Sequence, residues 1–262
     1  MERFLATLGK PVLDYLRFAG GSFLLLADAL GYLLHGRLNV RQTIRQMGVI
    51  GGDSLLIVIV TLLFGGMVLS LQTVSSFAKF GATNLIGGLV AVSVTRELAP
   101  VLTGVVVAAR AGSAMAAELG AMTVTEQVDA LRALAVSPTQ YLVVPRLVAG
   151  VLVLPIVTVF ANAAGMAGAF LVAVSQGVSA NEYIVSIQRY LVWSDLFGGL
   201  LKTAVFGGII ALVGTNQGLT TTGGAVGVGR STTAAVVLAI VLIYAFNYVL
   251  SWLILTTWAG VL

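Results

Sequence analysis

Long apolar stretches, separated by short polar segments, dominate the chain. Five of them approach or exceed the roughly 20 residues that a helix needs to cross a bilayer, namely 54–77, 84–109, 146–175, 193–216 and 233–257. The fourth qualifies although it contains Lys202. The third exceeds one crossing, so we expect it to be tilted, broken at Pro155 or extended beyond the bilayer. The pattern predicts an all-α integral membrane protein with about five transmembrane helices.

Residues 1–50 follow a different pattern. The apolar strip 20–34 contains Asp28 and is short for a span, which is more typical of a helix in the membrane interface. Further on, Arg41 and Arg45 take one face of a helix. Apolar residues take another face, at Val40, Ile44 and Met47. We interpret 1–50 as interfacial amphipathic helices, with a sixth span or a re-entrant hairpin at 20–34 as the alternative. No small-residue cleavage site follows the strip, so a cleavable signal peptide is not expected.

The composition agrees with a lipid environment and excludes several kinds of function. Of the 262 residues, 58% are hydrophobic and 9% are charged, whereas soluble domains carry about 25% charged residues. The chain has no cysteine and one histidine, His35, which excludes disulfides and thiol-ligated or histidine-rich metal sites. Gly9-Lys10 is followed by Pro11, so no phosphate-binding loop is present, and no basic run indicates nucleic acid. We expect no enzyme activity and no cofactor, with energy supplied by a partner or an ion gradient.

The distribution of basic residues indicates the orientation, because cytoplasmic loops carry an excess of Lys and Arg. With five spans, the N-terminal segment shares one side with the loops 110–146 and 217–232. Ten basic residues fall on this side, namely Arg3, Lys10, Arg17, Arg37, Arg41, Arg45, Arg110, Arg132, Arg146 and Arg230. Lys79 and Arg189 fall on the other side. We therefore predict a cytoplasmic N-terminus and an external C-terminus.

Arg96 and Glu97 lie near the middle of the second apolar stretch, in Ser93-Val-Thr-Arg-Glu-Leu-Ala-Pro100. A charge at the centre of a membrane helix costs about 2.5–3.5 kcal/mol, so both must face protein or a hydrated cavity. Neighbouring residues point about 100° apart on a helix, so at least one needs a partner on another helix. Candidate partners are Lys202, Asn162 and Asn247. A structural ion pair and a polar spot in a substrate cavity both remain open. Pro100 frees a backbone carbonyl one turn earlier and is expected to bend the helix.

The connection 110–145, between the second and third spans, is the longest one on the cytoplasmic side. Thr123 and Glu126 have the spacing of a capping box. An apolar stripe follows at helical spacing, at Val124, Val128, Leu131 and Leu134. Charged residues take other positions, at Glu126, Asp129 and Arg132. We predict a short amphipathic helix, which is either an ordinary interfacial helix or a docking element for a soluble partner.

Small residues recur every four positions on two of the spans, which permits close helix contact. They are Gly199, Thr203, Gly207 and Ala211, and also Gly104, Ala108, Gly112 and Ala116. The spacing leaves open whether the contacts lie within one chain or between two copies.

Several short motifs follow one another over 93–150. They are Arg96-Glu-Leu-Ala-Pro100, Ala109-Arg-Ala-Gly-Ser-Ala114, Ala117-Glu-Leu-Gly120, Thr125-Glu-Gln127, Ala135-Val-Ser-Pro138 and Pro145-Arg146. In this order they resemble the MlaE/YrbE-type permease family, the membrane subunits of ABC transporters that work with MCE-domain proteins in lipid trafficking. The remainder agrees in length, number of spans and the glycine-rich stretch ending at Gly227-Val-Gly-Arg-Ser-Thr232. Residues 81–92 and 175–192 contain none of these quoted motifs, so the surface toward an MCE-domain partner is unassigned.

The resemblance implies a single permease domain over 1–262, forming a homodimer in the bacterial inner (plasma) membrane. It implies that a separate ATPase binds ATP and docks on a cytoplasmic coupling helix within 110–135. It further implies an external MCE assembly that exchanges phospholipid or a related lipid with the dimer cavity. The lipid pathway would include Arg96, Glu97, Lys202 and Asn247. The ATPase contact would include Arg110, Glu118, Thr125, Glu126, Gln127, Asp129 and Arg132.

Three functions remain to be weighed, and a lipid ABC permease leads because of the motif series. The second is a secondary transporter or channel in which Arg96 and Glu97 handle protons or ions. Five spans divide poorly into the paired halves of an inverted repeat, which disfavours it. The third is a membrane scaffold. Co-purification distinguishes the three functions, because only the ABC permease requires a nucleotide-hydrolysing partner in the complex.

Overall fold

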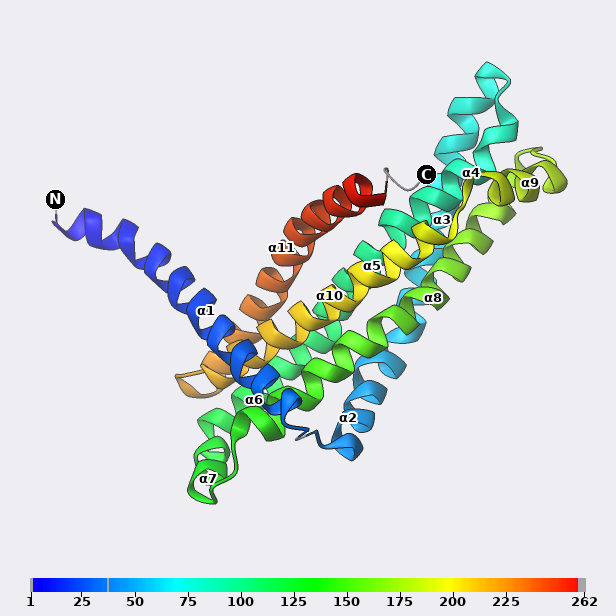
Figure 1. Ribbon diagram of the computed structural model, residues 1–262. Coiled ribbons are helices and arrows are strands. Elements are labelled where there is room, and N and C mark those ends of the chain that lie inside the picture. The colour runs from blue at the N-terminus through cyan, green and yellow to red at the C-terminus, as the bar shows by residue number, and fades with distance from the viewer. Residues whose placement is uncertain (1, 37, 259–262) are drawn as a thin grey trace.

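The computed structural model describes residues 2–36 and 38–258, and no strand occurs among them (Figure 1). The α-helices are α1 (Glu2–Leu34), α2 (Val40–Met47), α3 (Asp53–Phe77), α4 (Ile86–Ser93), α5 (Ala99–Val107), α6 (Ser113–Val124), α7 (Gln127–Ala133), α8 (Val144–Ser175), α9 (Ala180–Tyr190), α10 (Trp193–Leu219) and α11 (Gly224–Trp258). Short π- or 3-10-helical segments adjoin them: η1 (Gly48–Gly52), η2 (Ala78–Phe80), η3 (Thr83–Leu85), η4 (Val94–Leu98), η5 (Ala108–Gly112) and η6 (Thr139–Val143). Arg37, which the sequence places on the cytoplasmic side, lies outside the described residues, as do the side chains of Arg3, Lys10 and Arg17.

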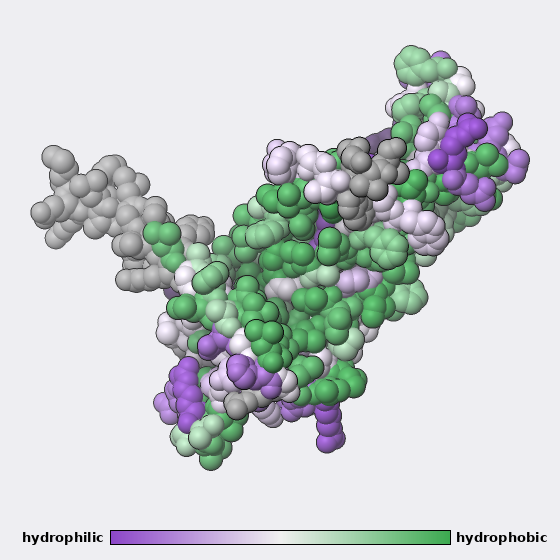
Figure 2. Space-filling view, in the orientation of Figure 1, coloured by the Kyte–Doolittle hydropathy of each residue, from purple (hydrophilic) through white to green (hydrophobic). Residues whose placement is uncertain are grey.

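Among the described residues, five continuous helical runs are long and apolar enough to cross a membrane, which confirms the predicted all-α class and number of spans. They are Val40–Phe77, Thr83–Val124, Thr139–Ser175, Trp193–Leu219 and Gly224–Thr257. On the face that Figure 2 shows, the middle of the molecule is mostly apolar, and hydrophilic residues gather near α9 at one end and near α2 and α7 at the other. An apolar middle section between polar ends is what a protein presents when lipid is the solvent for its middle.

The spans are longer than the sequence predicts, because π-helical turns carry the helix past positions where a break is expected. Through η1, α2 joins α3, so residues 40–52 extend the first span. Through η5, α6 extends the second span to Val124, which shortens the predicted loop 110–145. The third span continues without a break past Pro155, which lies inside α8.

The N-terminal region consists of one long helix, α1, followed by the short helix α2. The N-terminal part of α1 projects away from the other helices (Figure 1). Its later part packs against α8 and α10, where Nδ2 of Asn216 donates to Oγ of Ser22 at 2.7 Å. On α2, Thr43 and Gln46 are buried whereas Ile44 is 63% exposed, so an apolar side faces outward. Placement of both helices in the membrane interface stays a prediction.

Glycine sets the spacing of the central helices α3, α8 and α10. A Cβ at Gly66 would overlap the backbone of Gly165, and a Cβ at Gly207 would overlap the backbone carbonyl of Gly150. A Cβ at Gly199 would overlap the carbonyl oxygen of Thr95 in η4. All eight residues of the two four-residue stripes are buried within one chain, so these stripes serve contacts between helices of the same chain.

The two segments that carry none of the motifs quoted above, 81–92 and 175–192, pack against each other at the end of the molecule opposite α7 (Figure 1). The backbone N–H of Gly88 donates to Oγ of Ser186 at 2.9 Å. Tyr183 is buried on α9, where its ring meets the ring edge of Phe170 at a centroid distance of 5.6 Å. Burial raises the pKa of Tyr183 to about 12. One surface at this end of the molecule thus combines α4 and α9.

Replacing Gly207 with Ala should destabilise the bundle, because the new methyl group meets the backbone of α8 rather than a movable side chain. Overpacking of this kind costs about 1–3 kcal/mol. Gly208→Ala is the matched control, since its Cβ would meet the side chain of Val151 at an ordinary 3.4 Å. The melting temperature of the purified protein in detergent measures both. A Gly207→Ala variant that melts no lower than Gly208→Ala would contradict the packing described here.

Candidate functional site

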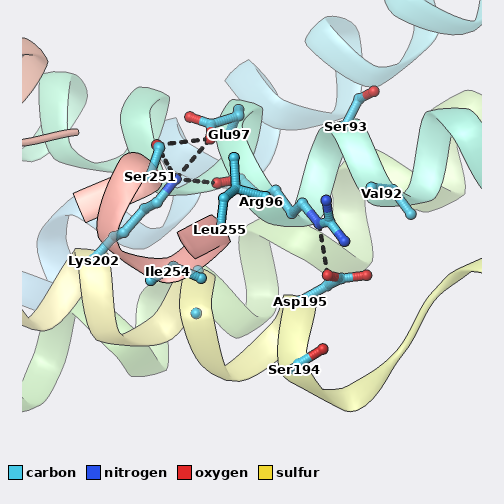
Figure 3. Close-up of a pocket in the computed structure, with 12 residues that line it drawn as sticks. Val92, Ser93, Arg96, Glu97, Ser194, Asp195, Lys202, Ser251, Ile254 and Leu255 are labelled. Carbon is cyan, nitrogen blue, oxygen red and sulfur yellow. Dashed lines mark hydrogen bonds and ion pairs between the residues drawn. The ribbon is translucent and has the colours of Figure 1, made fainter. Parts of the chain in front are cut away.

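Because the segment η4 is π-helical, its two adjacent charged residues, Arg96 and Glu97, face the same pocket. In η4 the N–H of Ala99 bonds to the carbonyl of Val94, five residues earlier, which widens the helix locally. Val94 and Thr95 are buried, whereas Arg96 and Glu97 line a cavity of about 450 Å³ (Figure 3). Turns of this type occur frequently at functional sites.

Lys202 of α10 is the centre of the polar contacts and is buried, with 4% of its side chain exposed. Its Nζ lies 2.7 Å from Oε1 of Glu97 and donates to Oγ of Ser251 at 2.8 Å. It also donates to the backbone carbonyl of Arg96 at 2.9 Å. Pro100 has no N–H for that carbonyl, which confirms that the proline frees an acceptor one turn earlier. All three donors of the ammonium group are used, as a buried charge requires.

Helix α11 completes the environment of Glu97. Nδ2 of Asn247 donates to Oε2 of Glu97 at 2.8 Å, and Oγ of Ser251 donates to Oε1 at 3.0 Å. Both carboxylate oxygens are therefore bonded, although 49% of the side chain is exposed. The Glu97 network, formed by Glu97, Lys202, Asn247 and Ser251, joins the second, fourth and fifth spans.

Arg96 forms the second ion pair of the pocket, with Asp195 in the first turn of α10. Nε of Arg96 lies 2.6 Å from Oδ1 of Asp195, and the side chains are 39% and 4% exposed. Oδ2 of Asp195 accepts from the N–H of Val192 at 3.3 Å, which caps the helix. The N-terminal end of a helix favours a carboxylate at this place. Asp195 is thus held from two sides, and the outer part of Arg96 stays accessible.

The pocket combines these charges with apolar walls. Ile254 and Leu255 of α11 and Val92 of α4 line it beside Arg96 and Glu97 (Figure 3). A cavity with a charged end and an apolar wall matches a molecule that has a polar head and an apolar body.

Two of the three partners predicted for the midspan charges are present. Lys202 and Asn247 contact Glu97, as described above. Asn162 does not, because it is buried in α8 and neither its Nδ2 nor its Oδ1 has a hydrogen-bond partner among the described residues. Sequence reasoning missed Asp195 and Ser251. Asp195 lies seven residues before Lys202 and Ser251 four after Asn247, so helical spacing places each missed residue beside a predicted one.

Two residues predicted in the coupling loop lie on the second span instead. Nη2 of Arg110 lies 2.9 Å from Oδ2 of Asp53, at the start of α3. Oε2 of Glu118, on α6, lies 2.8 Å from Nη2 of Arg146, on α8. Both ion pairs join helices of the bundle, because the second span continues well beyond residue 110.

The predicted capping box at Thr123 and Glu126 is wrong. Oγ1 of Thr123 donates to the carbonyl of Leu119 at 2.8 Å and lies 3.2 Å from that of Gly218. Thr123 therefore belongs to the last turn of α6. Glu126 begins α7 in the left-handed conformation, with φ of 61°, and its side chain makes no capping bond.

The short helix predicted after Glu126 exists as α7. Val128 is buried and Leu131 is half-buried, whereas Leu134 is 73% exposed because α7 ends before it. The remaining coupling candidates all lie exposed on or before α7, at Thr125, Glu126, Gln127, Asp129 and Arg132. The structure thus brings five of the seven candidates onto one exposed segment; their function stays a prediction.

In the part of the chain that the structure describes, five helical runs are long and apolar enough to cross a membrane, and three of them line the ion-paired, amphipathic pocket, which defines a multi-pass membrane protein. The chain belongs to the MlaE permease family, whose model, Permease MlaE, matches residues 43–253. This match confirms the resemblance that the motifs of 93–150 indicate.

Relatives agree with this membership over most of their length. A probable ABC transporter permease protein of Synechocystis is 47% identical over 233 residues, which cover 88% of this chain and 89% of that protein. The chloroplastic protein TRIGALACTOSYLDIACYLGLYCEROL 1 of Arabidopsis thaliana is 43% identical over 84% of this chain and 63% of its own length. The intermembrane phospholipid transport system permease protein MlaE of Haemophilus influenzae is 35% identical over 95% of this chain and 96% of its own.

Proposed function

We propose that the chain is the permease subunit of an ABC transporter that moves phospholipid or a related lipid, powered by a separate ATPase. The amphipathic pocket at η4 is the observation that carries this proposal. Family membership supports it, as does the phospholipid transport named for the Haemophilus influenzae relative.

Arg96 is the group in the pocket that suits an anionic head group. Asp195 bonds its Nε, and the described residues form no hydrogen bond to its two terminal nitrogens. Those nitrogens are planar, charged donors that match a phosphate. Ile254 and Leu255 would then lie against the acyl chains. Lys202, in contrast, has no donor left for a ligand.

A homodimer is part of the proposal, because Glu97 of the pocket is half-exposed and α11 is largely uncovered. The most apolar part of the fifth span is 17% buried, against 67% for the third. Glu97 is 49% exposed beside α11 and needs shielding from lipid tails. A second copy placed across α11 would enclose both pockets in one cavity.

The two ends of the molecule receive different partners in this proposal. The N-terminus is cytoplasmic and the C-terminus external, in the bacterial inner membrane, in agreement with the excess of basic residues on the α7 side. The ATPase docks on α7 and the turn before it. The external surface of α4 and α9 faces the MCE-domain partner.

Replacing Arg96 with Lys tests the pocket. Lysine keeps a charge for Asp195 but loses the two terminal nitrogens, so we expect lipid transfer by the reconstituted complex to fall about tenfold, equivalent to about 1.4 kcal/mol. Yield and melting temperature should stay close to those of the wild type. Arg41→Lys on α2 is the matched control, because it makes the same chemical change on an exposed side chain outside the pocket and outside the partner surfaces proposed above. Normal transfer by Arg96→Lys, or failure of that variant to assemble, would favour a purely structural ion pair.

Reversing the charges of Glu126 and Asp129 to Lys tests the docking surface. Both side chains are exposed, and the ion pair between Asp129 and Arg132 is a surface pair of small energetic value, so folding should be unaffected. We expect weaker retention of the ATPase in pull-downs, or hydrolysis without transport. In the pull-down, Glu182→Lys on α9 is the control for added positive charge, because the proposal places the ATPase on α7. If the double variant retains ATPase and transports lipid normally, α7 is an ordinary surface helix.

A further inference from the structure

Arg146 is the most deeply buried charged residue among those described, and it links three segments near α7. Only 1% of its side chain is exposed. Nη2 lies 2.8 Å from Oε2 of Glu118 on α6, and Nη1 donates to the carbonyl of Leu142 in η6 at 2.7 Å. The guanidinium therefore connects the end of the second span to the beginning of the third.

The end of the second span and the beginning of the third also form the surface against which α7 packs. Val128 of α7 packs in a cluster with Leu119 and Leu142, which we call the α7 cluster. Leu119 directly follows Glu118, and Leu142 supplies the carbonyl that Arg146 binds. The ion pair thus joins α6 and α8, the helices at the two segments that contact α7. The outward face of α7 stays exposed.

Stability alone gives a weak reason for such a pair. The guanidinium of Arg146 is buried, whereas 57% of the Glu118 side chain is exposed. Desolvation of the guanidinium offsets much of the attraction, so apolar residues of the same volume are often as stabilising. Its geometry, however, fixes the distance between α6 and α8. A displacement of α7 then moves the second and third spans together. If α6 and α8 could separate, the displacement would only change the distance between them.

We propose that the Glu118–Arg146 pair is a positioning element that transmits displacement of α7 to the second and third spans. Glu118 then serves the coupling by holding Arg146 rather than by contacting the ATPase. This inference rests on the proposed function, since it presumes that an ATPase docks on α7.

The test compares Glu118→Gln, Arg146→Met and the double variant in the reconstituted complex. Each change preserves much of the side-chain volume, and the double variant leaves no unpaired buried charge. We expect ATPase retention within twofold of wild type, continued hydrolysis, and at least a fivefold loss of lipid transferred per ATP hydrolysed. Asp53→Asn is the control, because it breaks another interhelical ion pair, with Arg110, that does not border the α7 cluster.

The alternatives give different results. A lower melting temperature with an unchanged ratio of lipid to ATP would make the pair structural and overturn the proposal. The same conclusion follows if all three variants fail to fold. Loss of ATPase retention in Glu118→Gln but not in Arg146→Met would make Glu118 a contact residue, which also overturns it. If the wild type itself retains no ATPase, the proposed function fails instead.

Discussion

The structure depends on neutralising one buried ammonium group, that of Lys202, inside a bundle of membrane-spanning helices. A charge in this setting needs all of its hydrogen bonds, since no bulk water is available to supply them. Glu97, Ser251 and the carbonyl of Arg96 supply them from two other spans. Helices α10 and α11 and the turn η4 are thereby fixed around a common point.

Three features of the backbone make this contact possible, and each has a cause in the sequence. Pro100 leaves the carbonyl of Arg96 without a helical donor. The π-helical turn η4 faces both Arg96 and Glu97 toward the pocket. Gly199 allows α10 to approach the backbone of η4. The pocket is a consequence of the same arrangement, because it lies between the elements that the Lys202 contacts hold together. Structural and functional interpretations of the two midspan charges are therefore compatible: Glu97 is fully bonded within the protein, and Arg96 retains donors for a ligand.

The spans could be predicted from sequence because long apolar runs are a strong signal. Lys202 and Asn247 could be predicted as partners because polar residues inside spans are few. Asp195 was missed because it lies at the end of its span, where a charge needs no special explanation. The capping box failed for a different reason. Packing of Met115 and Leu119 continues the second span through Val124, and this tertiary contact overrides the local signal at Thr123. Glu118 was predicted in a loop because the apolar run ends near residue 109, and the sequence does not show the packing that continues the helix.

The central claim is that the pocket beside the Glu97 network holds a lipid. Photo-crosslinking tests it directly, with a photoreactive residue at Ile254 in the pocket and, separately, at Leu56, which is 72% exposed on α3. The complex would be purified in detergent, freed of loosely bound lipid, irradiated and analysed by mass spectrometry. The account predicts phospholipid attached at position 254, at a level well above that at position 56. Equal levels at the two positions, or none at position 254, would contradict it.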